Sequence, residues 1–361
     1  MKNGLELNEL AATVIQRASG KEDFLVPTSA MRFSVATGNS IHIALPNDRE
    51  FGLSGNAENQ VTDFLGIPRR FATKLGAELP DLLAHNLNTL GEHQPARRML
   101  RTLSGEARAF LSDSYKRVDN EEVFDGLFPA LLRLGAQVES CNVSEDYMHI
   151  QAIFNRAEGE IRVGDPVKYG VIISNSEIGR GALSIRPLIY RLVCRNGAIV
   201  ADQTRRRAHV GGSYLENADL GWLALSSETQ KLKVKAMVAE LGEYLEALAD
   251  EGRFQMTLAR YKEVADQPIP ADPTPVVESL AARYSLNKSE SESALVALCE
   301  SKDYTRWGLA NAVTWIANSA ATYDRSVELE AVGGTLMGLS QTAFKALAVM
   351  PRASEIETVN A

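Results

Sequence analysis

Apolar and polar residues alternate with two different spacings along the chain, and the first 95 residues mix both. We expect strands in three short alternating stretches, FLVP (24–27), MRFSV (31–35) and SIHIAL (40–45). Helical spacing lies between and after them, and it predicts helices over residues 5–20, 54–65, from 68 onward, and 80–90. Ser54 is a typical N-cap, and Gly66-Ile67-Pro68 is a typical stop. Residues 1–95 therefore read as an N-terminal α/β segment.

The middle of the chain is richer in strand patterns. A strand is expected over 107–115, and apolar residues three to four apart predict a helix over 121–134 that ends at Gly135. Two hairpins are expected next, from residues 137–143 with 147–154 and from 169–174 with 181–185. This order predicts an antiparallel sheet with helices in residues 96–212.

The segment Pro187–Gly197 fits either a strand or a helix, and we favour a helix. Its apolar residues follow the 3.6-residue period, Pro187 suits a first helical turn, and Asn196-Gly197 suits a helix end. In either structure Arg191 and Arg195 are four residues apart and lie on one side.

The last third of the chain has a helical pattern. Ser227 and Gln230 form a capping box that opens a long helix to about residue 248. A proline-rich break at 268–275 follows, and further helices are expected over 276–283, 289–299 and 304–322. The fold class is therefore α+β, with a central antiparallel sheet and helices, plus a mainly helical C-terminal domain at 213–361.

Composition places this chain among globular proteins. The chain has 361 residues, of which 45% are hydrophobic and 23% are charged, and its net charge is −8. These values exclude a mostly disordered chain. The N-terminus lacks the apolar core of a signal peptide, and no stretch has the roughly 20 apolar residues that a membrane span needs. We therefore expect a cytoplasmic protein.

Charge is distributed unevenly. Residues 210–361 hold 13 Lys and Arg against 21 Asp and Glu, whereas residues 160–212 hold 9 basic against 4 acidic residues. A second basic group consists of Arg97, Arg98, Arg101, Arg108, Lys116 and Arg117. Arginine suits phosphate recognition because its planar guanidinium donates two parallel hydrogen bonds. The densest run, Arg205 to Arg207, fits a phosphate-binding loop, a solvated loop, or a docking site for the acidic C-terminal region.

No motif for catalysis or metal binding stands out. Cys141, Cys194 and Cys299 are far apart, and the five histidines have no ligand spacing. The run from Ser112 to Lys116 has hydroxyls beside Asp113, but no histidine is near in sequence. We therefore expect no metal, no cofactor and no enzyme, while a metal-dependent nuclease remains an open alternative.

Several runs of residues resemble a known family. They are FLVPTSAMRF, LSGNAENQ, LGIPRRF, RAFLSDSY, GVIISNSEIG, RLVCRNG and YDRSVELEAVGGTLM. Over about residues 20–340 this sequence resembles the phage/plasmid-like protein family, which is also domain-of-unknown-function family 932. The resemblance implies a mobile-element protein in the bacterial host cytoplasm, with a role in DNA recombination, replication or evasion of host defence. It brings no catalytic residues with it.

Together, the resemblance and the basic residues lead to the hypothesis of a DNA-binding protein that binds or anneals single strands. Arginine and lysine would contact phosphates, and tyrosines would stack on bases. The expected nucleic-acid-binding residues are Arg108, Lys116, Arg117, Arg180, Arg191, Arg195, Arg205, Arg206, Arg207, Tyr115 and Tyr190. We also expect a homo-oligomer. The alternatives are an interaction protein that engages a host or phage protein through its acidic C-terminal region, and the nuclease.

Overall fold

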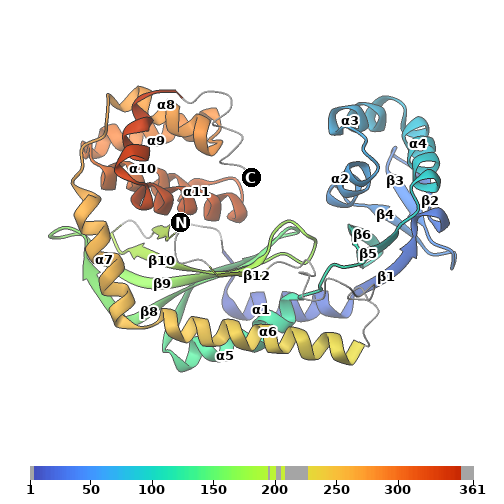
Figure 1. Cartoon of the computed structure of the whole chain (residues 1–361), viewed down its shortest axis with the longest axis horizontal. Helices are drawn as coiled ribbons and strands as arrows, with labels where there is room; N and C mark the ends of the chain where they lie inside the picture. Colours follow the sequence, from blue (N-terminus) through green and yellow to red (C-terminus); the bar gives the residue numbers. More distant parts are fainter. Residues whose placement is uncertain (1–3, 194–195, 201–204, 208–226, 351–361) are drawn as a thin grey trace.

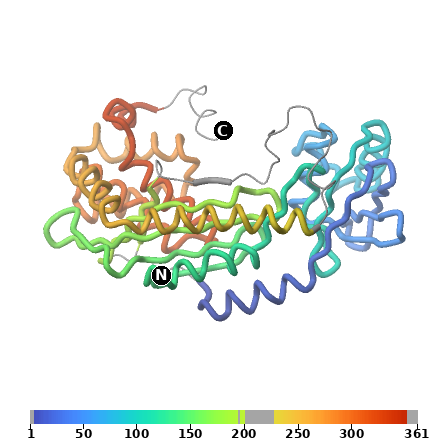
Figure 2. The backbone as a smooth tube through the Cα atoms, turned by 60° about the horizontal axis from the view of Figure 1, so that its bottom comes forward, coloured from blue at the N-terminus to red at the C-terminus, as the bar shows by residue number. Residues whose placement is uncertain are grey.

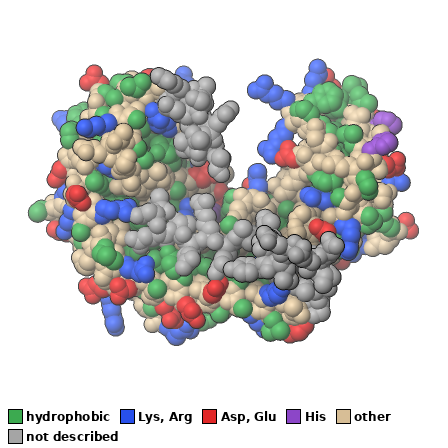
Figure 3. All heavy atoms as spheres, viewed as in Figure 1, with side chains coloured by type: hydrophobic (Ala, Val, Ile, Leu, Met, Phe, Trp, Pro, Cys, Tyr) green, Lys and Arg blue, Asp and Glu red, His purple; other side chains and the backbone are tan. Residues whose placement is uncertain are grey.

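The chain folds into two β-sheets and a set of helices, and the α+β class expected from the sequence is correct (Figure 1). The computed structural model describes residues 4–193, 196–200, 205–207 and 227–350, with the backbone alone at 205–207. One sheet lies in an N-terminal lobe, and the other carries the C-terminal helices. A wide hollow separates the N-terminal lobe from the C-terminal helices (Figure 3).

The N-terminal lobe is a six-stranded sheet covered by three helices. Its strand order is β1-β5-β6-β4-β3-β2, and all neighbours are antiparallel except the parallel pair β4 and β6. The strands are β1 (Lys21–Pro27), β2 (Arg32–Val35), β3 (Ile41–Ala44), β4 (Glu50–Leu53), β5 (Arg97–Leu103) and β6 (Glu106–Ser112), and the helices are α2 (Gly55–Phe64), α3 (Arg69–Glu78) and α4 (Pro80–His93). The expected boundary at residue 96 therefore falls between strands that pair with each other.

The central sheet is antiparallel throughout, as the sequence predicted. Its order is β11-β10-β9-β8-β7, and the short β12 also pairs with β10. Its strands are β7 (Ala136–Val143), β8 (Met148–Glu160), β9 (Pro166–Asn175), β10 (Leu183–Arg191), β11 (Asn196–Ile199) and β12 (Arg205–Arg207). Both predicted hairpins are confirmed, as β7–β8 and β9–β10.

The two faces of the central sheet differ in polarity because successive side chains point to opposite sides. One face carries Ile150, Tyr169 and Ile185, and it packs on α1 (Leu7–Ser19), α5 (Asn120–Arg133) and α6 (Ser227–Leu248), the layer below the sheet in Figure 1. The opposite face, which we call the polar face, carries His149, Gln151, Lys168, Ser174, Ser184, Arg186 and Tyr190.

The predicted helix over Pro187–Gly197 is wrong, because these residues belong to strands β10 and β11. Leu188 and Tyr190 are buried on one face of the sheet and Ile189 is buried on the other. The run is therefore apolar throughout and lacks the alternation that marks a half-exposed strand. Pro187 lies in β10 between the residues that pair with β12 (183–185) and those that pair with β11 (188–191). Its carbonyl oxygen accepts from Val200 N (2.8 Å). No ladder donor is required at that position.

The first of the C-terminal helices packs on the apolar face, where its Phe254 stacks on Tyr169, and the later ones pack against the other side of the central sheet at β11 (Figures 1 and 2). They are α7 (Glu251–Ala265), α8 (Pro273–Tyr284), α9 (Lys288–Ser301), α10 (Arg306–Ile316), α11 (Tyr323–Gly338) and α12 (Gln341–Lys345). The proline-rich break separates α7 from α8, and the helix expected over 304–322 ends at Ile316. Gly334 of α11 lies directly on β11, where a Cβ atom would be 1.8 Å from the Ile199 carbonyl oxygen.

We predict that Gly334→Ala destabilises the protein by about 2 kcal/mol, because the added methyl group forces α11 away from the sheet. Gly242→Ala in α6 is the matched control, since a Cβ at Gly242 meets nothing within 4 Å. It should stabilise the helix by about 0.5–1 kcal/mol. Urea denaturation of both variants measures the effect, and equal stability of the two would contradict this packing.

Candidate functional site

Eight charged side chains hold the N-terminal lobe against the central sheet. We call them the junction cluster; its members are Lys21, Asp23, Arg101, Arg108, Arg117, Asp119, Glu121 and Glu177. They come from β1, β5 and β6 of the N-terminal lobe, from the segment between β6 and α5, from the start of α5, and from the turn after β9. Four cations face four carboxylates, so the buried charge is balanced.

Glu177 is the centre of the junction cluster. Its carboxylate, 2% exposed, accepts from Asn120 N at the start of α5 (2.7 Å), from Lys21 Nζ and from Arg108 Nη1 (3.3 Å). Arg101 Nη1 donates to the Glu177 carbonyl oxygen (2.8 Å). A single residue of the turn after β9 therefore joins three strands of the lobe, β1, β5 and β6, to a helix of the central layer.

Asp119 and Lys21 show how the cluster sets its own charge state. Burial alone would raise the pKa of the Asp119 carboxyl group, but Arg101 and Lys21 together lower it below its usual value. Burial opposes protonation of Lys21, yet Glu177 and Asp119 raise the pKa of this ammonium group. Each charge is therefore stabilised by its partners across the junction.

Two of the expected DNA contacts are inside this junction, and their predicted surface position is wrong. Arg108 is 7% exposed and pairs with Glu177, and Tyr115 is 5% exposed with its hydroxyl donating to the Ser176 carbonyl oxygen (3.3 Å). Arg117 is partly buried and pairs with Asp23 (2.9 Å). These side chains hold the two lobes together, which a count of basic residues along the sequence does not reveal.

The other expected contacts are dispersed. Arg180 is exposed at the β9–β10 turn beside Asp146 (3.2 Å), Lys116 is partly buried, and Arg191 pairs with Asp165 (2.5 Å). Tyr190 lies on the polar face. Arg195 is outside the described residues, and Arg205 to Arg207 form β12, of which only the backbone is described.

A basic and aromatic surface on α3 was missed by the sequence analysis. Basic side chains gather over α3 on the side of the N-terminal lobe that faces the hollow (Figure 3). Arg69, Arg70 and Lys74 are exposed there, and Phe71 is 50% exposed beside them. The first turn of α3 has two arginines and no acidic residue, an arrangement that the helix dipole disfavours. The run PRRF in the sequence could therefore have indicated a functional basic surface.

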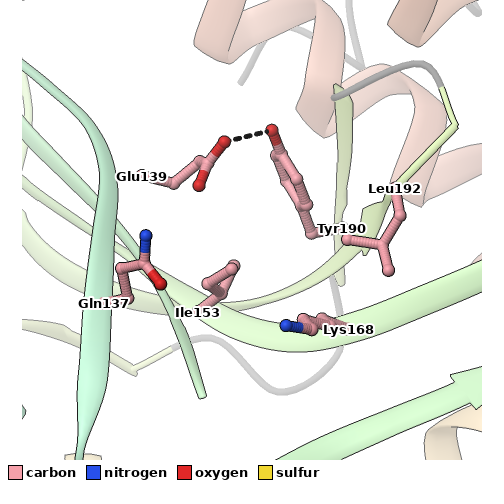
Figure 4. A pocket seen from close by; sticks show the side chains of 6 residues that line it. All are labelled: Gln137, Glu139, Ile153, Lys168, Tyr190 and Leu192. Atoms are coloured by element: carbon pink, nitrogen blue, oxygen red, sulfur yellow. Dashed lines mark hydrogen bonds between the residues drawn. The ribbon is translucent and has the colours of Figure 1, made fainter. Parts of the chain in front are cut away.

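The polar face of the central sheet contains a pocket of about 440 Å³. Its lining residues are Gln137, Glu139, Ile153, Lys168, Tyr190 and Leu192 (Figure 4). The Tyr190 hydroxyl donates to Glu139 Oε1 (2.8 Å), while no hydrogen bond or ion pair joins the Lys168 side chain to another described residue. The pocket thus offers a cation, a carboxylate and an amide within one concave surface.

His149 lies at the other end of the polar face, between Ser174 and Asp324. Its Nδ1 is 2.8 Å from Ser174 Oγ, and its Nε2 is 3.3 Å from Asp324 Oδ1. Tyr147 and Tyr323 stack on the imidazole ring. Ser174 is only 5% exposed near the end of β9, so a substrate has no access to its hydroxyl in this conformation. The His149 group therefore anchors the start of α11 to the sheet.

The described part of the chain shows neither a metal-binding cluster nor a membrane-spanning helix. No three His, Cys, Asp or Glu side chains are grouped there so that they could hold a metal ion. None of the helices described is both long and apolar enough to cross a bilayer.

Comparison with known proteins gives one match. A family model described as "Domain of unknown function (DUF932)" matches residues 108–332, more than half of the chain. No curated protein and no solved structure matches. The matched range includes the central sheet, Glu177, the pocket and the His149 group, whereas α3 precedes it.

We predict that Glu177→Gln lowers the free energy of unfolding by about 3–5 kcal/mol, because it leaves Lys21 and Arg108 buried without their carboxylate. Glu106→Gln is the matched control, since Glu106 is exposed and forms no ion pair with a described residue. Guanidinium unfolding measures both variants. If Glu177→Gln lost no more unfolding free energy than the control, Glu177 would not be the residue on which the cluster depends.

We also predict a specific acid dependence. The pKa of Asp119 is lower in the folded chain than the unfolded value of about 3.9, so the unfolded state binds more protons and stability rises with pH across this interval. The contribution of Asp119 is complete above about pH 4 and is lost as the pH falls through its folded pKa. Asp119→Asn should therefore lose less stability between pH 5 and 2 than the parent, whatever its stability at pH 7. If the unfolding free energies of the parent and of Asp119→Asn fell in parallel between pH 5 and 2, Asp119 would not be the source of this acid dependence.

Proposed function

This chain belongs to the DUF932 family, and from that premise we propose that it binds single-stranded DNA in the hollow between its two lobes. The observation that carries the proposal is the surface of α3, a helix that borders this hollow and on which Arg69, Arg70, Phe71 and Lys74 are exposed (Figures 1 and 3). Cationic side chains beside an exposed aromatic ring are what a single strand requires, because phosphates pair with the charges and bases stack on the ring.

The charges on α3 are available to a ligand. Asp63 pairs with Arg69 (2.6 Å) and Glu78 is 3.9 Å from Lys74, but no described residue forms an ion pair with Arg70. All three side chains are exposed, so these surface pairs cost little to exchange for phosphate. The positive end of the helix adds to the attraction for anions.

The position of β12 supports the same site. Its backbone pairs with Leu183–Ile185, the end of β10 that follows the turn containing Glu177 and Arg180. The run Arg205 to Arg207 is thereby attached to the central sheet on the side where the two lobes meet. We propose that these arginines, with Arg180, contact the strand from the opposite side to α3.

We further propose that the protein acts in recombination or replication of a mobile element, in the cytoplasm of a bacterial host, and that it works as a homo-oligomer. Single-strand binding and annealing need no catalytic group. This agrees with the junction cluster, whose buried charged residues pair with one another and hold the two lobes together. An interaction with a host or phage protein through the acidic C-terminal region is the alternative outcome of the test below.

Fluorescence anisotropy with a labelled oligonucleotide at several salt concentrations tests the proposal. Arg70→Ala with Lys74→Ala should weaken binding and reduce the slope of log affinity against log salt by about 1.4, or about 0.7 per phosphate contact. Phe71→Ala should weaken binding roughly fivefold or more with an unchanged slope, because stacking is not ionic.

The matched control is Lys233→Ala with Lys235→Ala, two exposed lysines of α6 on the opposite side of the central sheet. This variant should bind with the parent's affinity and slope. Absence of binding at low salt by the parent would overturn the proposal, and equal losses in both double variants would show that charge acts without a defined site.

A further inference from the structure

We propose that the pocket on the polar face holds one base of the bound strand and selects the bases whose exocyclic amine lies beside a ring nitrogen that accepts, cytosine and adenine, over thymine. This inference rests on the proposed function. It assigns a chemical role to the six residues that line the pocket, none of which takes part in the junction cluster.

The hydrogen-bonding groups of the pocket fit the Watson–Crick edge of an amine-bearing base. Glu139 is an acceptor whose Oε1 already receives the Tyr190 hydroxyl proton (2.8 Å), which holds the carboxylate in place and leaves Oε2 for a second donor. Cytosine and adenine present an amine beside a ring nitrogen that accepts, and a carboxylate accepts well from such an amine. The Gln137 amide, which faces the same pocket in Figure 4, supplies a donor for the ring nitrogen.

Thymine has the reverse pattern at this edge. Its O4 is an acceptor and would face the Glu139 carboxylate, so two acceptors would meet without a proton between them. An unsatisfied polar group in a recessed site costs more than a hydrogen bond gains, and the pocket should therefore discriminate against thymine. Ile153 and Leu192 provide apolar surface for the base plane.

Lys168 supplies the charge for the phosphate of the same nucleotide. Its ammonium group has no ion pair with a described residue, although Glu158 lies opposite it in the β8–β9 register. The pocket volume of about 440 Å³ is within the range of small-molecule sites and leaves room for a nucleotide.

The pocket is on the same sheet as the proposed DNA path. Strand β9 runs from Lys168 at the pocket to Asn175, two residues before Glu177 at the lobe junction. Six residues separate Lys168 from Ser174 on this face, which is roughly 20 Å at the rise of a strand. Helix α11 covers the face between these two ends, where Ile172 is 0% and Ser174 is 5% exposed, so a bound strand of several nucleotides reaches the pocket by passing around α11.

The test compares oligo-dC with oligo-dT of equal length, two pyrimidine strands of similar size, by anisotropy at one salt concentration. The parent should bind oligo-dC roughly fivefold more tightly than oligo-dT. Glu139→Gln should abolish this preference, because its amide can donate to thymine O4. Glu160→Gln, an exposed glutamate of β8 outside the pocket, should keep the preference. Lys168→Met should weaken binding to both strands and reduce the salt slope by about 0.7.

The outcomes separate the pocket from the proposed function. Equal binding of dC and dT by the parent, or an unchanged preference in Glu139→Gln, overturns the base pocket and leaves single-strand binding in place. If the parent binds no oligonucleotide, the proposed function fails. Calorimetry with dCMP and dTMP then decides the pocket: binding of dCMP alone supports it, and binding of neither or of both equally overturns it.

Discussion

The buried carboxylate of Glu177 is the constraint on which the arrangement of this protein depends. Taking a carboxylate out of water costs several kcal/mol, and this cost is offset only where enough donors surround it. Lys21, Arg108 and the backbone amide of Asn120 meet that requirement, and they belong to the N-terminal lobe and to α5. The lobe can satisfy Glu177 only in one orientation relative to the central sheet. That orientation places α3 across the hollow from the C-terminal helices and leaves the polar face of the sheet toward the same side.

The same interaction explains which parts of the fold the sequence could predict. Hairpins β7–β8 and β9–β10 were predicted because each consists of two short strand-like runs separated by a polar turn, at residues 144–146 and 175–180, and these turns are visible in the sequence. The segment Pro187–Gly197 was misassigned because its strands are buried on both faces, which removes the alternation. Strand β5 was not predicted at all: Arg97, Arg98 and Arg101 break its apolar pattern, and Arg101 is buried only because Asp23 and Asp119 pair with it.

The candidate site was predictable in chemistry but not in position. A basic, arginine-rich surface was expected, and one exists, but on α3 and not at Arg108 or Tyr115. A sequence does not show whether an arginine has a buried carboxylate partner, since Glu177 is separated from Arg108 by 69 residues. Exposure decides the role: Arg108 at 7% holds the lobes together, whereas Arg70, which is exposed, remains available to phosphate. Glu177 and the pocket both belong to the central sheet and to the matched family range, so the sheet that orients the lobe also carries the proposed base site.

The most direct measurement of the central claim is the position of a bound strand. A single-stranded oligonucleotide with photoreactive bases, cross-linked to the protein and mapped by mass spectrometry, identifies the residues it touches. The account predicts cross-links in α3 at residues 69–74 and at the pocket that Glu139, Lys168 and Tyr190 line, and none in α5 or α6 on the apolar side of the sheet. Cross-links confined to α5 and α6, or to the outer surface of the C-terminal helices, would contradict binding between the lobes.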